Sequence, residues 1–123
     1  MKAFIFLSMI FCHIVDDYYL QGWLASAKQK KYWKENAPDE LYKYDYIMAL
    51  IMHSMSWSFM IMLPIAIFMQ LEISLKFMII WVINAIIHGI VDKLKANLFK
   101  INLIEDQCIH IIQIIITACL LLN

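Results

Sequence analysis

The chain has 123 residues, of which 63% are hydrophobic and 16% charged, with only two glycines and two prolines. This balance lies well outside that of a soluble domain. Ten basic and ten acidic residues cancel, and the basic ones form no single stripe, which argues against a nucleic-acid partner. The three cysteines lie in apolar runs without zinc-ribbon or disulfide spacing, so we predict packed thiols. The composition therefore favours a protein whose main solvent is lipid.

Four apolar runs are long enough to cross a bilayer, which needs about 20 mostly apolar residues per helix. They cover residues 3–24, 46–71, 75–91 and 104–122. No small-residue cleavage site follows the first run, so we take it as a span and not as a signal peptide. We predict an all-α polytopic membrane protein, with residues 1–123 forming one domain of four transmembrane helices in a bundle. Its first partner is the lipid bilayer, and the small size of the chain is compatible with a homo-oligomer.

The connection 25–45 is the one long polar segment, and tryptophans and tyrosines accompany its lysines. Such aromatic residues favour the membrane interface, so we predict an amphipathic interfacial loop between helices 1 and 2. Five lysines lie in this connection and three in the third connection, whereas only Lys2 and Lys76 lie on the other side. The positive-inside rule then places both lysine-rich connections in the cytoplasm and both termini outside it. The reversed orientation remains an alternative.

Polar residues inside the apolar runs recur at helical spacing. Their positions are His13, Asp17 and Gln21 in the first run, His53 in the second, Asn84, His88 and Asp92 in the third, and Asp106, His110, Gln113 and Thr117 in the fourth. Steps of three or four residues place side chains on one face of a helix. Charged residues in a bilayer are costly and normally turn toward the bundle interior. By the predicted topology, the histidines and aspartates meet at one depth in the cytoplasmic leaflet.

Histidine and aspartate side chains on facing helices are the usual ligands of a metal site in a bundle. The candidate ligands are His13, Asp17, His53, His88, Asp92, Asp106 and His110. A divalent metal is the predicted cofactor, with zinc ahead of manganese and iron, bound as one ion or two. Gln21, Asn84, Gln107 and Gln113 are the predicted partners that orient the ligands.

Several residues have simpler interpretations. The His/Asp pairs could be hydrogen bonds that fix helix packing, and Asp106 could interact with the helix dipole. Lys95 is expected to pair with Asp92 or to contact an anionic headgroup, and otherwise to serve as an interfacial anchor. Asp16 and Glu105 are expected to face the headgroups. Pro64 could kink the second helix, and Trp57 is expected to contribute packing.

Taken together, His13-x-x-x-Asp17-x-x-x-Gln21, His53, His88-x-x-x-Asp92-x-x-Lys95 and Asp106-Gln107-x-x-His110 resemble the family called domain of unknown function 3307. Its members are small membrane proteins of bacteria and phages. The chain is also similar, more distantly, to inner-membrane proteins of the YdjM type, which are described as metal-dependent hydrolases. The resemblance implies the cytoplasmic membrane of a bacterium as location, with a phage as a possible source of the gene.

The functional hypotheses belong to three classes. The first is a membrane-embedded metal site that performs hydrolysis, with Asp106 as general base or bridging ligand. The second is a proton or ion pathway built from the same residues. The third is a non-enzymatic, phage-encoded interaction protein whose polar layer specifies bundle assembly. Whether the protein is an enzyme, and which substrate it would use, does not follow from these residues.

Overall fold

The computed structural model describes residues 1–122, and all regular structure within this range is helical. Four long helices dominate: α1 (Lys2–Val15), which continues as the π-helix η1 (Asp16–Leu20), α4 (Asp45–Phe68), α5 (Leu75–Ala96) and α6 (Leu103–Leu122). Each is long and apolar enough to cross a membrane. The all-α class and the number of candidate spans are therefore confirmed.

The ends of the long helices follow local signals that hydropathy does not register. The first helix ends at Leu20, and Gly22 follows in the left-handed region with φ +47°, which glycine adopts at little cost. The third runs five residues beyond its predicted end because Lys93 and Lys95 in its last turn suit the negative end of the helix dipole.

Side-chain caps start the last two long helices. The Ser74 hydroxyl accepts a hydrogen bond from the Phe77 N–H at the start of α5. Before α6, the Asn102 side chain accepts from the Glu105 N–H while the Glu105 carboxylate accepts from the Asn102 N–H. Glu105 is exposed, as expected, and helix α4 continues through Pro64.

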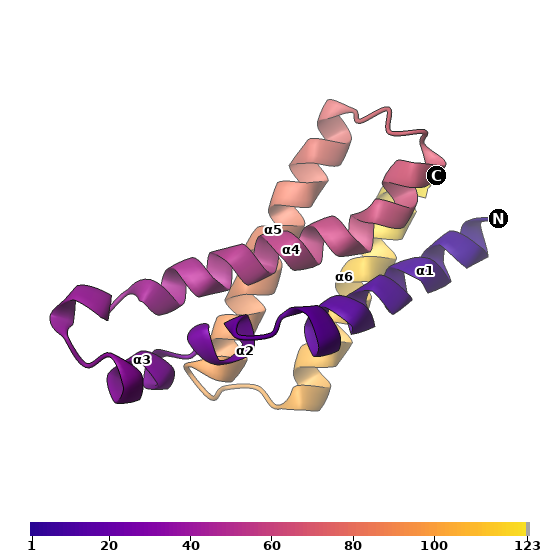
Figure 1. Cartoon of the computed structure of the whole chain (residues 1–123). Coiled ribbons are helices and arrows are strands. Elements are labelled where there is room, and N and C mark those ends of the chain that lie inside the picture. Colours follow the sequence, from indigo (N-terminus) through magenta and orange to yellow (C-terminus); the bar gives the residue numbers. More distant parts are fainter. Residues whose placement is uncertain (123) are drawn as a thin grey trace.

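The four long helices run up and down, so that both termini lie at the end of the molecule opposite the connection 21–44 (Figure 1). One buried core joins all of them, and it fills the half of the bundle that is nearer the termini. Its members are Ile5 and Met9 of α1, Trp57, Ile61, Met62, Ile65 and Ala66 of α4, Phe77 and Ile80 of α5, and Ile114 and Ala118 of α6.

The connection 21–44 is more ordered than the predicted loop. It contains α2 (Leu24–Ala27), α3 (Lys30–Asn36) and the 3-10 helix η2 (Glu40–Tyr42). The Trp33 ring stacks on Tyr42 and donates its N–H to the Ala27 carbonyl. The Asn97 side chain, just after α5, accepts from the Lys30 N–H and donates to the Lys28 carbonyl. The connection is thus fastened to the end of α5.

Candidate metal centre

A group of eight histidines and aspartates, which we call the His/Asp cluster, lies inside the bundle at the end nearer the connection 21–44. Its members are His13, Asp16 and Asp17 from α1 and η1, His53 from α4, His88 and Asp92 from α5, and Asp106 and His110 from α6. None of these residues is more than 8% exposed. All seven predicted ligands are therefore brought together, and all four long helices contribute.

The π-helix η1 explains how two consecutive aspartates both enter the cluster. The Gln21 N–H bonds to the Asp16 carbonyl, five residues back, which widens the turn. Asp17 faces His53 and His88, while Asp16 accepts a hydrogen bond of 2.6 Å from the Ser56 hydroxyl. The expectation that Asp16 faces the headgroups was wrong, because it assumed a regular α-helix, in which neighbouring residues point about 100° apart.

His53 and His88 form the centre of the cluster, and their Nε2 atoms face each other at 3.2 Å. Two carboxylates flank this pair. Asp17 Oδ1 lies 3.4 Å from His53 Nε2 and 4.0 Å from His88 Nε2. Asp92 Oδ2 lies 3.4 Å from His53 Nε2 and 3.8 Å from His88 Nε2. Four helix-borne donor atoms therefore converge on the gap between the two imidazoles.

His110 and Asp106 lie on the α6 side of this centre. His110 Nε2 is 3.4 Å from Asp106 Oδ1 and 3.8 Å from Asp92 Oδ1. The His110 ring stacks on His88, with ring centroids 4.2 Å apart. Two sets of three residues have donor atoms close enough to share an ion: Asp17, His53 and His88, and also His88, Asp92 and His110. The two sets overlap at His88, so they describe one contiguous site.

Two lysine ammonium groups reach the outer edge of the cluster. Lys28, from the connection 21–44, lies 2.6 Å from Asp92 Oδ2, and its side chain is 11% exposed. Lys95, near the end of α5, lies 2.6 Å from Asp106 Oδ2. Lys95 therefore pairs with Asp106 and not with Asp92, and Lys28 takes the place at Asp92. No local pattern predicts this contact of Lys28, because its position depends on how the connection folds.

His13 takes part in a chain of hydrogen bonds at the side of the metal-binding sets. Its Nδ1 accepts from the Trp57 indole N–H at 2.8 Å, so its proton lies on Nε2, which donates to Gln107 Oε1 at 3.0 Å. The Gln107 amide then donates to Asp106 Oδ2 at 3.0 Å and approaches Asp17 Oδ2 at 3.4 Å. Both ring nitrogens of His13 are thus engaged, and His13 belongs to neither set of three.

Trp57 has a larger part in the site than its predicted packing role. Its fully buried ring stacks on His88, with centroids 4.2 Å apart and planes 17° apart, while its N–H holds His13. Trp57 follows His53 by four residues, so both side chains lie on one face of α4. That spacing was the available signal for its role.

The four predicted orienting residues separate into three kinds of contact. Gln107 touches the cluster directly, whereas the Gln21 side chain donates to the backbone carbonyl of Asp17. Asn84 and Gln113 form another polar layer with Thr117: the Gln113 amide donates to Asn84 Oδ1 at 2.8 Å, and Asn84 donates to Thr117 Oγ1 at 2.9 Å. No hydrogen bond or ion pair joins this layer to the His/Asp cluster among the described residues, so its role is to join α5 to α6.

Several buried atoms of the cluster have no hydrogen-bond partner within residues 1–122. They are Asp16 Oδ2, Asp17 Oδ1, His53 Nδ1, His88 Nδ1, Asp106 Oδ1, and both Nδ1 and Nε2 of His110. Buried polar atoms are normally hydrogen-bonded, since leaving one without a partner costs about 1–3 kcal/mol. So many in one place indicate a site that is built to receive a further group.

The donor set of imidazoles and carboxylates is of the kind that holds a divalent metal ion. The cysteines do not join it: Cys108 and Cys119 are exposed, which corrects the prediction that they are packed, and Cys12 is half-buried.

No family model, curated protein or solved structure matches this chain.

Proposed function

We propose that this protein is an integral membrane protein of the bacterial cytoplasmic membrane that binds one divalent metal ion, with zinc as the first choice, within the His/Asp cluster. The ligands are His53, His88, Asp17 and Asp92. The observation that carries the proposal is that these four side chains, from all but one of the long helices, surround the buried gap between His53 Nε2 and His88 Nε2.

Membrane placement is supported by the outward-facing side chains of the long helices. Large apolar residues are exposed along every one of them, including Phe4 of α1 at 74% and Phe59 of α4 at 56%. In water such a surface would promote aggregation, whereas in lipid it is the expected exterior. We therefore propose that the connection 21–44 lies at the interface. The lysine distribution supports an orientation with this connection and the His/Asp cluster on the cytoplasmic side.

The charges inside the cluster favour a divalent cation. Four carboxylates are buried there, and two of them, Asp92 and Asp106, are paired with the ammonium groups of Lys28 and Lys95. With neutral histidines, two negative charges remain, which one divalent ion would balance. Isolated buried charges are strongly unfavourable, so a compensating cation would stabilise the folded bundle.

Protonated histidines are the competing source of positive charge, and the geometry disfavours protonating both histidines at the centre of the cluster. Two imidazolium rings at His53 and His88 would face each other at 3.2 Å. Like unit charges at that distance repel by about 5 kcal/mol at an effective dielectric constant of about 20. A shared cation instead uses the lone pairs of both Nε2 atoms.

The spacing of the donor atoms also suits an ion. Ligands at about 2.0–2.1 Å from a tetrahedral zinc are separated from one another by roughly 3.3–3.4 Å. The distances from His53 Nε2 to His88 Nε2, Asp17 Oδ1 and Asp92 Oδ2 are 3.2, 3.4 and 3.4 Å, close to this spacing. The two carboxylates lie farther from His88 Nε2, at 4.0 Å for Asp17 and 3.8 Å for Asp92, so a bound ion would draw them toward it. Asp16 Oδ2 lies 3.8 Å from His53 Nδ1, on the opposite side of the ring. No hydrogen bond joins these two atoms, but the negative charge of the carboxylate would favour the proton on Nδ1 and leave Nε2 free to bind.

Metal-dependent hydrolysis is the enzymatic form of this proposal, and His110 is the observation that favours it. A bound divalent ion would supply Lewis-acid chemistry. His110 Nε2 lies beside the proposed ligand Asp92, and both of its ring nitrogens are without hydrogen-bond partners in the described range. His110 would therefore accept a proton from the attacking water, and Asp106, held by Lys95, would orient the His110 ring. This assignment replaces the role as general base first given to Asp106. The resemblance to the domain of unknown function 3307 family is part of the same proposal.

A proton or ion pathway is less well supported. Beyond the His/Asp cluster, the polar layer of Asn84, Gln113 and Thr117 extends the polar region by one step. The remaining half of the bundle is filled by the buried apolar core, in which Ile61, Ile65 and Ile114 are fully enclosed. A continuous polar path between the two ends would have to cross this core.

The test is metal content. The full chain is purified in detergent and dialysed against a buffer that contains trace divalent metals. Its bound elements are then measured by mass spectrometry. We expect about one divalent ion per chain in the wild type and almost none in His88→Gln. Gln113→Leu, which alters the neighbouring polar layer, is the matched control and should keep the ion. A metal-free wild type, or equal metal in His88→Gln, would refute the proposal.

A further inference from the structure

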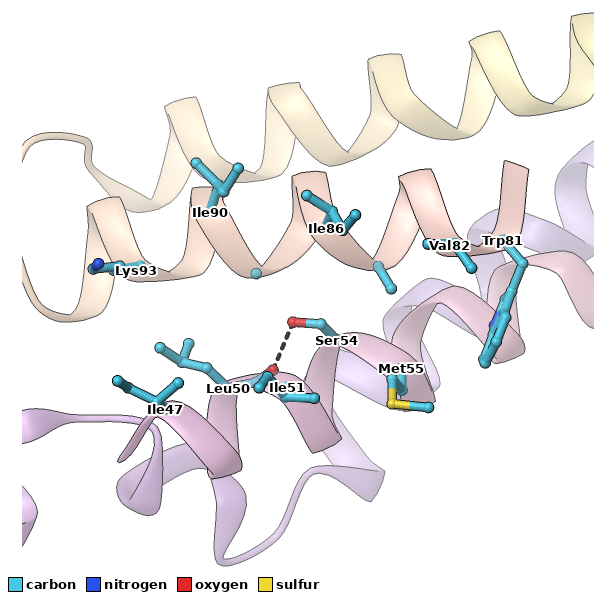
Figure 2. A pocket seen from close by; sticks show the side chains of 12 residues that line it. Ile47, Leu50, Ile51, Ser54, Met55, Trp81, Val82, Ile86, Ile90 and Lys93 are labelled. Atoms are coloured by element: carbon cyan, nitrogen blue, oxygen red, sulfur yellow. Dashed lines mark hydrogen bonds between the residues drawn. The ribbon is translucent and has the colours of Figure 1, made fainter. Parts of the chain in front are cut away.

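An apolar groove of about 400 Å³ opens on the outer surface between α4 and α5 (Figure 2). Its α5 wall consists of two adjacent stripes at steps of four residues: one is Trp81, Ala85, Gly89 and Lys93, and the other is Val82, Ile86 and Ile90. The first stripe has a large ring at one end, small residues in the middle and an ammonium group at the other end. The groove belongs to neither the His/Asp cluster nor its polar contacts.

The small residues give the groove its depth. A Cβ atom on Gly89 would lie 2.8 Å from the Ser54 hydroxyl, so α4 and α5 approach closely there because residue 89 is glycine. The Ser54 hydroxyl donates to the Leu50 carbonyl of its own helix. Its proton is therefore engaged, and the floor of the groove offers no free donor there. An occupant must be apolar along most of its length.

The length of the groove matches one leaflet. Trp81 and Lys93 are twelve residues apart, and a helix rises 1.5 Å per residue, so the groove runs for roughly 18 Å. A hydrocarbon core of about 30 Å has leaflets of about 15 Å. Lys93 marks the end near the connections, where the headgroups of that leaflet lie in the proposed orientation.

The charge at the headgroup end is uncompensated. Lys93 is exposed, and no carboxylate of residues 1–122 pairs with it, whereas Lys28 and Lys95 on the same side are engaged by Asp92 and Asp106. At the deep end, the buried indole N–H of Trp81 also lacks a partner in the described range. A molecule that fits has an anionic head beside Lys93 and an apolar tail along Ala85 and Gly89.

We infer that this groove binds an anionic phospholipid of the cytoplasmic leaflet, with its headgroup at Lys93 and one acyl chain between α4 and α5. The inference rests on the proposed membrane placement and is independent of the metal. A helix of a second copy is the other occupant of suitable shape, but the unpaired ammonium group at the mouth favours an anion.

Native mass spectrometry of the full chain in detergent tests this inference, with phosphatidylglycerol and phosphatidylcholine added in equal amounts. We expect one phosphatidylglycerol to be retained in preference to phosphatidylcholine. One lysine near an anionic surface contributes a factor of about five in binding. Lys93→Gln should therefore lower the phosphatidylglycerol preference about fivefold, whereas the control Lys100→Gln, an exposed lysine outside the groove, should not.

A second pair of variants tests the acyl-chain site. Ala85→Leu fills the groove and should lower the retention of both lipids, while Ala3→Leu adds the same side chain on an exposed face of α1 and should not. Equal effects within either pair would overturn the inference, as would a lipid-free dimer that Ala85→Leu converts to monomer. Metal content is measured on the same samples. Unchanged metal with no lipid preference would refute the lipid site alone, and loss of metal from the wild type would refute the metal site alone.

Discussion

Asp16 offers the sharpest test of how the His/Asp cluster is organised. The carboxylate places Oδ2 3.8 Å from His53 Nδ1, and its Oδ1 is held by the Ser56 hydroxyl. Asp16→Asn keeps the shape and an acceptor for Ser56, but removes the second carboxylate oxygen. The proton of His53 is then no longer favoured on Nδ1, and an Nε2–H would point into the site and block its lone pair.

The expected cost is a fall in metal affinity of about 10- to 100-fold, the usual effect of removing a group that orients a metal-binding histidine. This corresponds to about 1.4–2.7 kcal/mol of binding free energy. Because an ion that binds the folded state stabilises it in proportion to the logarithm of its affinity, the stabilisation by excess metal should shrink by the same amount. Without metal, Asp16→Asn removes a buried charge and should leave stability equal or higher.

The assay is competition against a chelating zinc indicator in detergent, together with thermal unfolding of the same samples with and without metal. Glu72→Gln, an acid-to-amide change in the exposed turn between α4 and α5, is the control. If Asp16→Asn binds metal as tightly as Glu72→Gln, the orienting role is refuted. If it loses the same stability with and without metal, Asp16 serves packing alone.

Three further changes separate the parts of the site. Lys28→Gln removes the ammonium group 2.6 Å from Asp92, so the metal affinity measured with the indicator should rise. Limited proteolysis within residues 21–44 should become faster, because the connection loses this contact with α5. An unchanged affinity would show that Lys28 does not compete with the ion. Gln107→Ala breaks the chain from His13 to Asp106 and should lower the unfolding free energy by about 1–3 kcal/mol, with metal content in elemental analysis retained; its loss would make His13 part of the binding set. Asn84→Ala should destabilise the fold equally with and without metal in thermal unfolding, because its contacts are to Gln113 and Thr117, and a metal-dependent difference would contradict that separation.

Helical period and hydropathy were sufficient to predict the four long helices and the meeting of their histidines and aspartates. Those predictions depend on side-chain spacing within one helix, as with His88 and Asp92, and on the alternation of helix direction. The members of the His/Asp cluster lie at one level because they sit near corresponding helix ends. Up-and-down packing brings such positions together whatever the helix crossing angles are.

The finer features depend on structure that periodicity does not encode. Asp16 enters the cluster through a π-turn, and Lys28 reaches Asp92 only because the connection 21–44 folds back onto α5. The pairing of Lys95 is also tertiary: spacing favours Asp92 on its own helix, but Asp106 at the start of α6 lies closer. Asn84 and Gln113 share the polar stripes of their helices with His88 and His110, yet they form a layer of their own. A stripe predicts the face of a helix and not the partner.

The most direct test of the account is X-ray absorption spectroscopy at the metal edge of the purified, metal-loaded chain. If His53, His88, Asp17 and Asp92 hold the ion, the spectrum should show a shell of about four nitrogen and oxygen atoms at roughly 2.0–2.1 Å, with the outer-shell scattering of two imidazoles. His88→Gln should lose one imidazole contribution or the ion itself. Sulfur at about 2.3 Å, or an all-oxygen shell with no imidazole scattering, would contradict the account.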